Sequence, residues 1–142
     1  MIFGQDRNQM RRVFFESWRK YRNGLPLEPL EDAIASAIRE HPEYHAILED
    51  EEISLHKDYL PEMGQANPFL HLAMHLAIRE QITTDRPAGI RGMRQQLLNR
   101  LHDPHEVEHQ MAECLAEIIW QAQRNQTAPD EIAYLDCLQK KM

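Results

Sequence analysis

The fold class is decided by the stretch NPFLHLAMHLAIREQIT, which occupies positions 67–83. Asn67 is a favourable helix N-cap and Pro68 a favourable first helical residue, so this pair predicts where a helix begins. From Phe69 to Ile78 every residue except two histidines is apolar, which leaves no polar face over that span. We therefore expect this stretch to form a buried central helix.

Helical spacing of apolar residues recurs along the remainder of the chain, and no stretch alternates with the two-residue period of a strand. The expected helices cover residues 6–21, 29–40, 42–50, 67–83, 90–101, 104–125 and 130–140. Residues 51–66, which include Pro61 and Gly64, are expected to form a loop that contains at most one turn of helix. About six or seven helices with short connections predict an all-α protein, a compact helical bundle around the central helix.

Length and composition indicate a single globular domain that spans residues 1–142. Apolar residues make up 42% and charged residues 27% of the chain, proportions typical of folded globular proteins. No apolar run is long enough to cross a membrane, and residues 1–12 lack the apolar segment of a signal peptide. We therefore expect a cytoplasmic protein that has no membrane partner.

The charge of the chain argues against nucleic acid as a partner. Its formal net charge is −7, whereas affinity for phosphate backbones depends on clustered Lys and Arg. The expected first helix is a local exception, because its basic residues could form either a binding face or the solvated side of an amphipathic helix. These residues are Arg7, Arg11, Arg12, Arg19, Lys20 and Arg22. A protein partner fits this composition, and no small-molecule substrate is indicated.

Cys114 and Cys137 are the only cysteines, and both fall in expected helices. Their spacing matches neither a CxxC redox motif nor a cysteine-type zinc site. We expect two buried, reduced thiols.

The eight histidines include three pairs with four-residue spacing. On a helix this spacing puts two rings on one face about a turn apart, so that both imidazoles can reach one ion or two adjacent ions. Mixed imidazole and carboxylate ligands from several helices are how helical bundles hold pairs of iron or manganese ions. The candidate ligands are His41, His45, His71, His75, His105 and His109, with Glu49 and Glu113 as carboxylate members.

This pattern predicts a mononuclear or dinuclear metal site, with iron as the first choice and manganese or zinc as alternatives. His71 and His75 support it most, because rings buried on an apolar helix need partners for their nitrogens. The competing hypothesis is a metal-free protein-interaction module, in which the His and Glu side chains form a buried hydrogen-bond network. The pattern does not decide whether a bound metal would be catalytic.

Two short motifs suggest hydrolytic chemistry but fit it poorly. The run His105-Glu106-Val107-Glu108-His109 has the HExxH form of zinc proteases, in which the first glutamate is the general base. The charged Glu108 and the proline before the motif depart from that signature. The dipeptide His102-Asp103 is found in metal-dependent phosphohydrolases, although Asp103 already serves as a helix N-cap.

Four longer runs carry a family resemblance: HPEYH at 41–45, NPFLHLAMHLA at 67–77, ECL at 113–115 and WQAQR at 120–124. On these runs the chain resembles a small bacterial family that is known only as a domain of unknown function. The resemblance spans nearly the whole chain and implies no established activity.

The chain also resembles, more weakly, hemerythrin-like bundles, whose di-iron centre uses His-x3-Glu and His-x3-His elements. The matching residues are His45 with Glu49, His109 with Glu113, and His71 with His75. DinB-like bundles, with three histidines around one metal, are a comparable likeness. Both likenesses imply a metal-binding helical bundle, and neither gives a cellular role.

Overall fold

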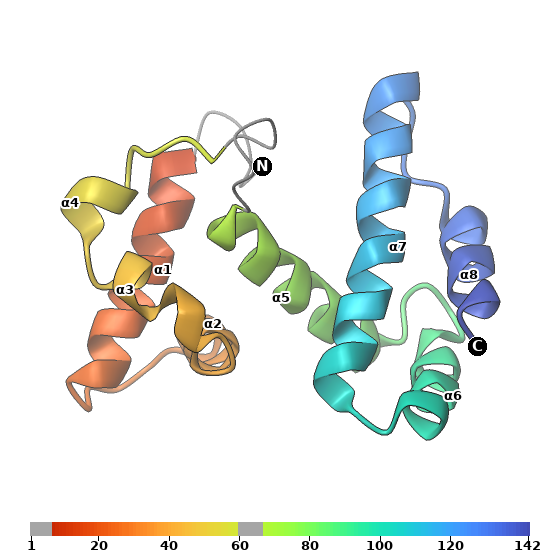
Figure 1. Cartoon of the computed structure of the whole chain (residues 1–142), viewed down its shortest axis with the longest axis horizontal. Helices are drawn as coiled ribbons and strands as arrows, with labels where there is room; N and C mark the ends of the chain where they lie inside the picture. Colours follow the sequence, from red (N-terminus) through yellow and green to blue (C-terminus); the bar gives the residue numbers. More distant parts are fainter. Residues whose placement is uncertain (1–6, 60–66) are drawn as a thin grey trace. The chain divides into compact units, whose positions relative to one another are not determined.

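A computed structural model describes residues 7–59 and 67–142, and in these ranges it contains eight α-helices, one short 3-10 helix and no strand (Figure 1). The predicted all-α class is confirmed. The chain divides into two compact units, unit 1 (Met1–Ala73) and unit 2 (Met74–Met142), and the boundary falls within helix α5 (Pro68–Thr84). The prediction of a single domain over residues 1–142 stays a prediction.

Unit 1 is built on α1 (Arg7–Arg22) and α2 (Pro29–Arg39), which pack against each other. The 3-10 helix η2 (Pro42–Tyr44) and the short helices α3 (His45–Leu48) and α4 (Glu51–Ser54) follow. The buried apolar side chains of this unit are Phe14, Phe15, Trp18, Ile34, Ala35, Ala37, Ile38, Leu48, Leu55, Phe69 and Leu72. Those on α1 and α2 are spaced three and four residues apart, so each helix buries one face.

The segment 51–66, predicted to be a loop with one turn of helix, begins with the single turn α4, as expected. Asp50 caps this turn, because its side chain accepts a hydrogen bond from the backbone N–H of Ile53. Positions 60–66, with Pro61 and Gly64, lie outside the described residues.

Most basic residues of α1 pair with carboxylates of unit 1. The ion pairs are Arg7 with Asp58, Arg19 with Glu16, Lys20 with Glu31, and Arg22 with Glu49. Exposed pairs of this kind stabilise a protein by only about 0–1 kcal/mol, but each places an anion beside a cation. Helix α1 therefore presents a solvated face of mixed charge, not a continuous basic face.

Arg11 differs from the other basic residues of α1, since it is 1% exposed. One guanidinium nitrogen donates to the carbonyl oxygens of Ser54, Leu55 and Lys57 at 3.3, 3.0 and 2.7 Å. The guanidinium also lies over the ring of Phe69, 4.6 Å from its centroid. Carbonyls at a helix end carry partial negative charge and lack intrahelical donors, so Arg11 caps the C-terminal end of α4.

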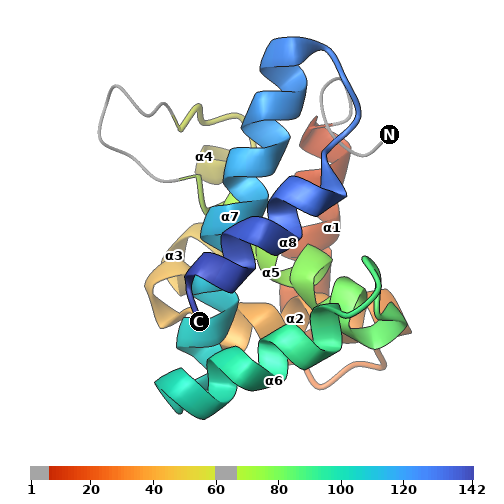
Figure 2. The ribbon, with the colours of Figure 1, turned by 90° about the vertical axis from the view of Figure 1, so that its right-hand side faces the viewer.

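Unit 2 contains the remainder of α5, α6 (Ile90–Leu101), α7 (Pro104–Asn125) and α8 (Glu131–Lys140). Helix α8 returns antiparallel alongside α7, and α6 contacts both helices (Figures 1 and 2). Its buried core consists of Ile78, Ile90, Leu97, Val107, Met111, Cys114, Leu115, Ile118, Tyr134 and Leu138. This core gives α5, α6, α7 and α8 one shared apolar interior.

The helix boundaries of unit 2 follow local capping signals. Asp103 accepts hydrogen bonds from the backbone N–H groups of His105 and Glu106, and Asp130 accepts one from Ala133. Helix α6 ends at His102 in the left-handed conformation, with φ of 61°. The dipeptide His102-Asp103 thus has a structural role, as the end of one helix and the cap of the next.

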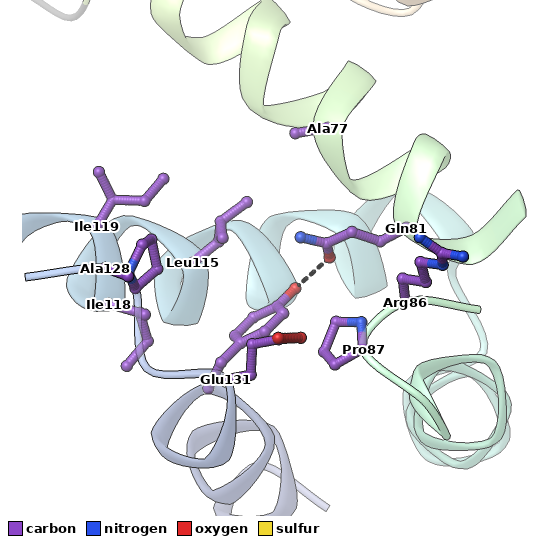
Figure 3. Close-up of a pocket in the computed structure, with 11 residues that line it drawn as sticks. Ala77, Gln81, Arg86, Pro87, Leu115, Ile118, Ile119, Ala128 and Glu131 are labelled. Carbon is purple, nitrogen blue, oxygen red and sulfur yellow. Dashed lines mark hydrogen bonds between the residues drawn. The ribbon is translucent and has the colours of Figure 1, made fainter. Parts of the chain in front are cut away.

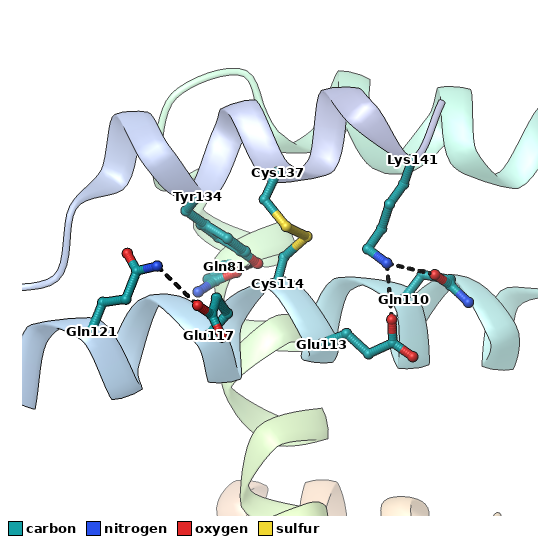
Figure 4. Close-up of a disulfide and its surroundings, with 9 residues drawn as sticks. All are labelled: Gln81, Gln110, Glu113, Cys114, Glu117, Gln121, Tyr134, Cys137 and Lys141. Atoms are coloured by element: carbon teal, nitrogen blue, oxygen red, sulfur yellow. Dashed lines mark hydrogen bonds and ion pairs between the residues drawn. A yellow bond between two sulfur atoms is a disulfide. The ribbon is translucent and has the colours of Figure 1, made fainter.

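The prediction of two reduced thiols is wrong. Cys114 on α7 and Cys137 on α8 form a disulfide between the two antiparallel helices (Figure 4). The described part of the chain has no free cysteine. Sequence spacing could not show this bond, because it depends on which faces of α7 and α8 meet.

Helix α5 begins and ends within one residue of its predicted limits. Leu70 on its first turn is 51% exposed, although the sequence pattern placed it on a helix without a solvent face. The prediction that α5 is a buried central helix stays a prediction. In the described residues, no helix has both the length and the apolar character needed to cross a membrane.

Candidate metal centre

The first turns of α7 in unit 2 place two imidazoles on one face. Asp103 and Pro104 fix the start of α7, so that His105 and His109 lie one turn apart on the helix. Their ring centroids are 4.2 Å apart. Both side chains are partly buried, which keeps one edge of the pair away from bulk water.

The third imidazole of unit 2 comes from α5. His75 is 0% exposed, and its ring centroid lies 5.4 Å from that of His105 and 5.0 Å from that of His109. One ring nitrogen from each of the three histidines lies within 4.8 Å of those of the other two. Two nitrogens bound to one tetrahedral zinc ion lie about 3.3 Å apart, because each Zn–N bond is about 2.0–2.1 Å. Small side-chain rotations would therefore bring the three nitrogens to one ion.

A carboxylate holds His75 in place. The ring Nδ1 of His75 donates to Oε1 of Glu108 at 2.6 Å. Arg79 donates to the same carboxylate through Nε, 3.3 and 3.1 Å from its two oxygens, and through Nη2 at 3.2 Å. Arg79 lies four residues after His75 on α5, so one helix turn presents both donors to Glu108.

Glu108 is ionised in this arrangement. Its burial alone would raise the pKa, but the hydrogen bonds from His75 and Arg79 outweigh that effect and lower the pKa to about 2. A charged carboxylate can only accept hydrogen bonds, so Nδ1 of His75 must carry the proton. The coordinating lone pair of His75 is then on Nε2. This is the carboxylate–histidine pairing that fixes the tautomer of metal-bound imidazoles.

The predicted ligands His41 and His71 belong to unit 1. His41 is 1% exposed, and its Nδ1 donates to the carbonyl oxygen of Ala37 at 2.9 Å. Its ring stacks on Tyr44, with centroids 5.5 Å apart, and meets the edge of His71 at 5.0 Å. These two histidines form an aromatic cluster with Tyr44.

The other predicted ligands have partners of a different kind. Nε2 of His45 donates to the carbonyl oxygen of Ile38 at 2.9 Å, and its ring lies 4.6 Å from that of Trp18. Glu49 lies 3.5 Å from a guanidinium nitrogen of Arg22. Glu113 pairs with Lys141 on the surface of unit 2, where 65% of its side chain is exposed (Figure 4). His45 is thus engaged with a helix end, and both carboxylates are engaged with cations.

Glu106, the glutamate of the HExxH form, accepts a hydrogen bond from Gln110 at 2.8 Å. It is not among the potential ligands that cluster with His105 and His109. The geometry therefore lends no support to a protease-type general base.

Sequence reasoning missed Glu108 and Arg79. In the sequence, Glu108 was noted only as a charged residue that departs from the HExxH signature. A usable signal was present, because Glu108 lies three residues after His105 and Arg79 lies four after His75, which are the spacings of neighbours on one helix face. What the spacing could not show is that the two helices meet at these residues.

Fold and site define an all-helical protein with an imidazole cluster supported by a partly buried carboxylate. Residues 6–140 match a family described as a domain of unknown function (DUF1841), and the chain belongs to that family. No curated protein and no solved structure matches the chain significantly. The predicted membership in a family of unknown function is confirmed, whereas similarity to hemerythrin-like or DinB-like bundles is not shown.

Proposed function

We propose that this protein binds a divalent transition-metal ion in unit 2 through His75, His105 and His109. The observation that carries the proposal is the hydrogen bond from Nδ1 of His75 to Glu108 at 2.6 Å, the arrangement that orients metal-bound imidazoles so that the other ring nitrogen faces the ion. Two further imidazoles lie within 4.8 Å of that ring. Imidazole is the commonest metal ligand among protein side chains, and three imidazoles from two helices match the ligand number of many catalytic zinc sites.

The donor set indicates the class of ion. Imidazole suits zinc, copper, iron and nickel, whereas manganese and magnesium prefer carboxylate and water oxygens. The three clustered ligands are all imidazoles, and Glu108 is occupied by His75 and Arg79. Zinc or iron therefore fits this set better than manganese. Three protein ligands would leave a coordination position for water or a small molecule, as in catalytic rather than structural zinc sites.

The remaining predicted ligands, His41, His45, His71, Glu49 and Glu113, are not needed for this three-histidine site. That any of them contributes to a larger centre stays a prediction, as does a cytoplasmic location.

Isothermal titration of untagged, chelator-treated protein with zinc tests the proposal. We expect one zinc ion to bind. His105→Ala or His109→Ala should each weaken zinc binding by more than about 100-fold, because the loss of a residue that only supports a ligand weakens metal binding by at most about that factor. Both side chains are only partly buried, so the variants should fold, which circular dichroism can verify. His102→Asn is the matched control, because His102 is exposed and asparagine tolerates its left-handed backbone.

Failure of the protein to bind zinc in this titration, and copper or iron in parallel titrations, would contradict the proposal. So would wild-type zinc affinity in both His105→Ala and His109→Ala. Either result would favour the metal-free hypothesis, in which His75, Glu108 and Arg79 form a buried network that sets the packing of α5 on α7.

A further inference from the structure

A second feature of unit 2 is an open cavity of about 500 Å³ beside α8 (Figure 3). This volume lies within the range of roughly 300–1,000 Å³ that small-molecule sites occupy. Its walls come from α5, the segment after α5, α7 and the start of α8. The candidate metal ligands His75, His105 and His109 do not line it, so it is a separate site.

The walls of the cavity are aliphatic. Leu115, Ile118 and Ile119 line one side from α7, and Ala77 lines another from α5 (Figure 3). Leu115 and Ile118 are only 8% and 5% exposed, so they form a deep apolar surface rather than a rim. An occupant would gain about 25 cal/mol for each Å² of apolar surface removed from water. The body of a ligand for this cavity should therefore be hydrocarbon.

Two polar side chains meet at the cavity. The hydroxyl of Tyr134 donates to Oε1 of Gln81 at 2.7 Å, and Figure 3 shows the amide nitrogen of Gln81 directed away from this bond. Tyr134 is 2% exposed, and burial raises its pKa, so the hydroxyl keeps its proton. Because Oε1 is occupied, Gln81 offers the cavity an N–H donor. Such a donor suits a ligand oxygen and does not suit an ammonium group.

Arg86 lines the cavity from the segment after α5, and its side chain is exposed. Within residues 7–59 and 67–142, no carboxylate forms an ion pair with Arg86. Glu131 at the start of α8 is the anionic member of the lining. A negatively charged ligand group would therefore settle beside Arg86 and Gln81 rather than beside Glu131.

We infer that this cavity binds a small apolar monocarboxylic acid, with its hydrocarbon body against Leu115, Ile118 and Ile119 and its carboxylate toward Arg86 and Gln81. The inference does not depend on the metal site. Unit 2 would then bind a second ligand besides the metal ion, a small alkanoate with an apolar body and a charged carboxylate.

Titration of the full-length protein with octanoate, octanol and octylamine, followed by NMR chemical shifts, tests this assignment. We expect octanoate to bind most tightly and to shift the resonances of Ala77, Ile118 and Ile119. Arg86→Gln should weaken octanoate binding by up to about fivefold, the size of an exposed charge interaction, and leave octanol binding unchanged. Ile119→Gln should weaken both ligands by about fourfold or more, because it removes apolar wall.

Arg124→Gln is the matched control. Arg124 is an exposed arginine on α7 that lies over the Trp120 ring and does not line the cavity. Octylamine binding as tight as octanoate binding would overturn the assignment. Equal octanoate affinity in Arg86→Gln and Arg124→Gln would overturn it as well. The assignment would also be overturned if none of the three ligands shifted the resonances and the wild-type protein self-associated whereas Ile119→Gln did not. A second copy of the chain would then be the occupant of the cavity.

Discussion

His45 in unit 1 and His75 in unit 2 occupy the same position in a His-x3-His pair, yet their surroundings differ. The N–H of His45 donates to a neutral backbone carbonyl, that of Ile38, and the ring lies against Trp18. The N–H of His75 donates to the ionised Glu108, and its ring meets two more imidazoles. Both kinds of acceptor occur behind metal-bound histidines, but a carboxylate raises the basicity of the imidazole more than a neutral carbonyl does. The acceptor, not the spacing, distinguishes the two histidines.

The buried charges of the two units show the same contrast. Unit 1 buries the guanidinium of Arg11 among three carbonyl oxygens, which serve only to hold it. Unit 2 buries the carboxylate of Glu108 among donors, one of which belongs to a candidate metal ligand. Under the proposed function, the polar interior of unit 1 is structural, whereas that of unit 2 supports a metal ligand. Four changes would sharpen or break this comparison.

The largest effect on stability is expected at Arg11. Arg11→Met should lower the free energy of unfolding of unit 1 by about 4 kcal/mol, because it leaves two buried carbonyls and one partly buried carbonyl without their donor. Urea unfolding followed by the fluorescence of Trp18, a buried residue of unit 1, measures this loss. The exposed Arg12→Met should change stability by less than about 0.5 kcal/mol. Equal effects of the two substitutions would show that Arg11 is not a structural clamp.

The disulfide should produce the next largest effect, in unit 2. Breaking Cys114–Cys137, which are 23 residues apart, should lower the stability by about 3 kcal/mol through the greater freedom of the unfolded chain. The urea midpoint should therefore fall when a reducing agent is added. Cys114→Ser/Cys137→Ser should have that lower midpoint with and without reductant. Two thiols that react with a maleimide in unreduced, denatured protein would contradict the disulfide.

The presence or absence of the Cys114–Cys137 disulfide also bears on cellular location. Disulfides persist in oxidising compartments and are rare in the cytoplasm of mesophiles. The cytoplasmic location therefore stays a prediction, and the state of the Cys114–Cys137 bond in the cell would test it.

Glu108→Gln tests whether the carboxylate of Glu108 strengthens His75 as a zinc ligand. The amide keeps the shape of the side chain but removes the charge, so zinc affinity should fall by about 10- to 100-fold. Glu106→Gln is the matched control, since Glu106 lies on the same helix but is not among the clustered ligand groups and accepts a hydrogen bond from Gln110 instead. Equal zinc affinity in the two variants would make Glu108 a structural residue and remove the contrast with His45.

The smallest effect should appear only in alkali. Burial raises the pKa of Tyr134 above its ordinary value of 10.0, so the folded protein keeps a phenolic proton that the unfolded chain releases. Stability from this residue is complete below about pH 10 and declines as the pH rises further, by at most about 1.4 kcal/mol per pH unit. Tyr134→Phe should show a shallower decline than the wild type between about pH 10 and 11. Parallel declines would indicate that Tyr134 titrates alike in both states.

The helices could be predicted from the sequence because their signals are local. Asp103 and Asp130 cap the helices that they were expected to begin, and α5 begins at the proline that follows Asn67. Contacts between helices could not be predicted in this way. Which helix faces meet decides both the hydrogen bond between His75 and Glu108 and the disulfide between Cys114 and Cys137. The four-residue spacing of histidines is also the same whether the rings bind a metal or only form structural hydrogen bonds.

The most direct test of the central claim is X-ray absorption spectroscopy at the zinc edge of the zinc-loaded protein. Coordination by His75, His105 and His109 predicts at least three imidazoles with Zn–N distances of about 2.0–2.1 Å and no sulfur ligand. His109→Ala should lose one imidazole, and His45→Ala should lose none. A spectrum with two or fewer imidazoles, or one that His109→Ala leaves unchanged, would contradict the account.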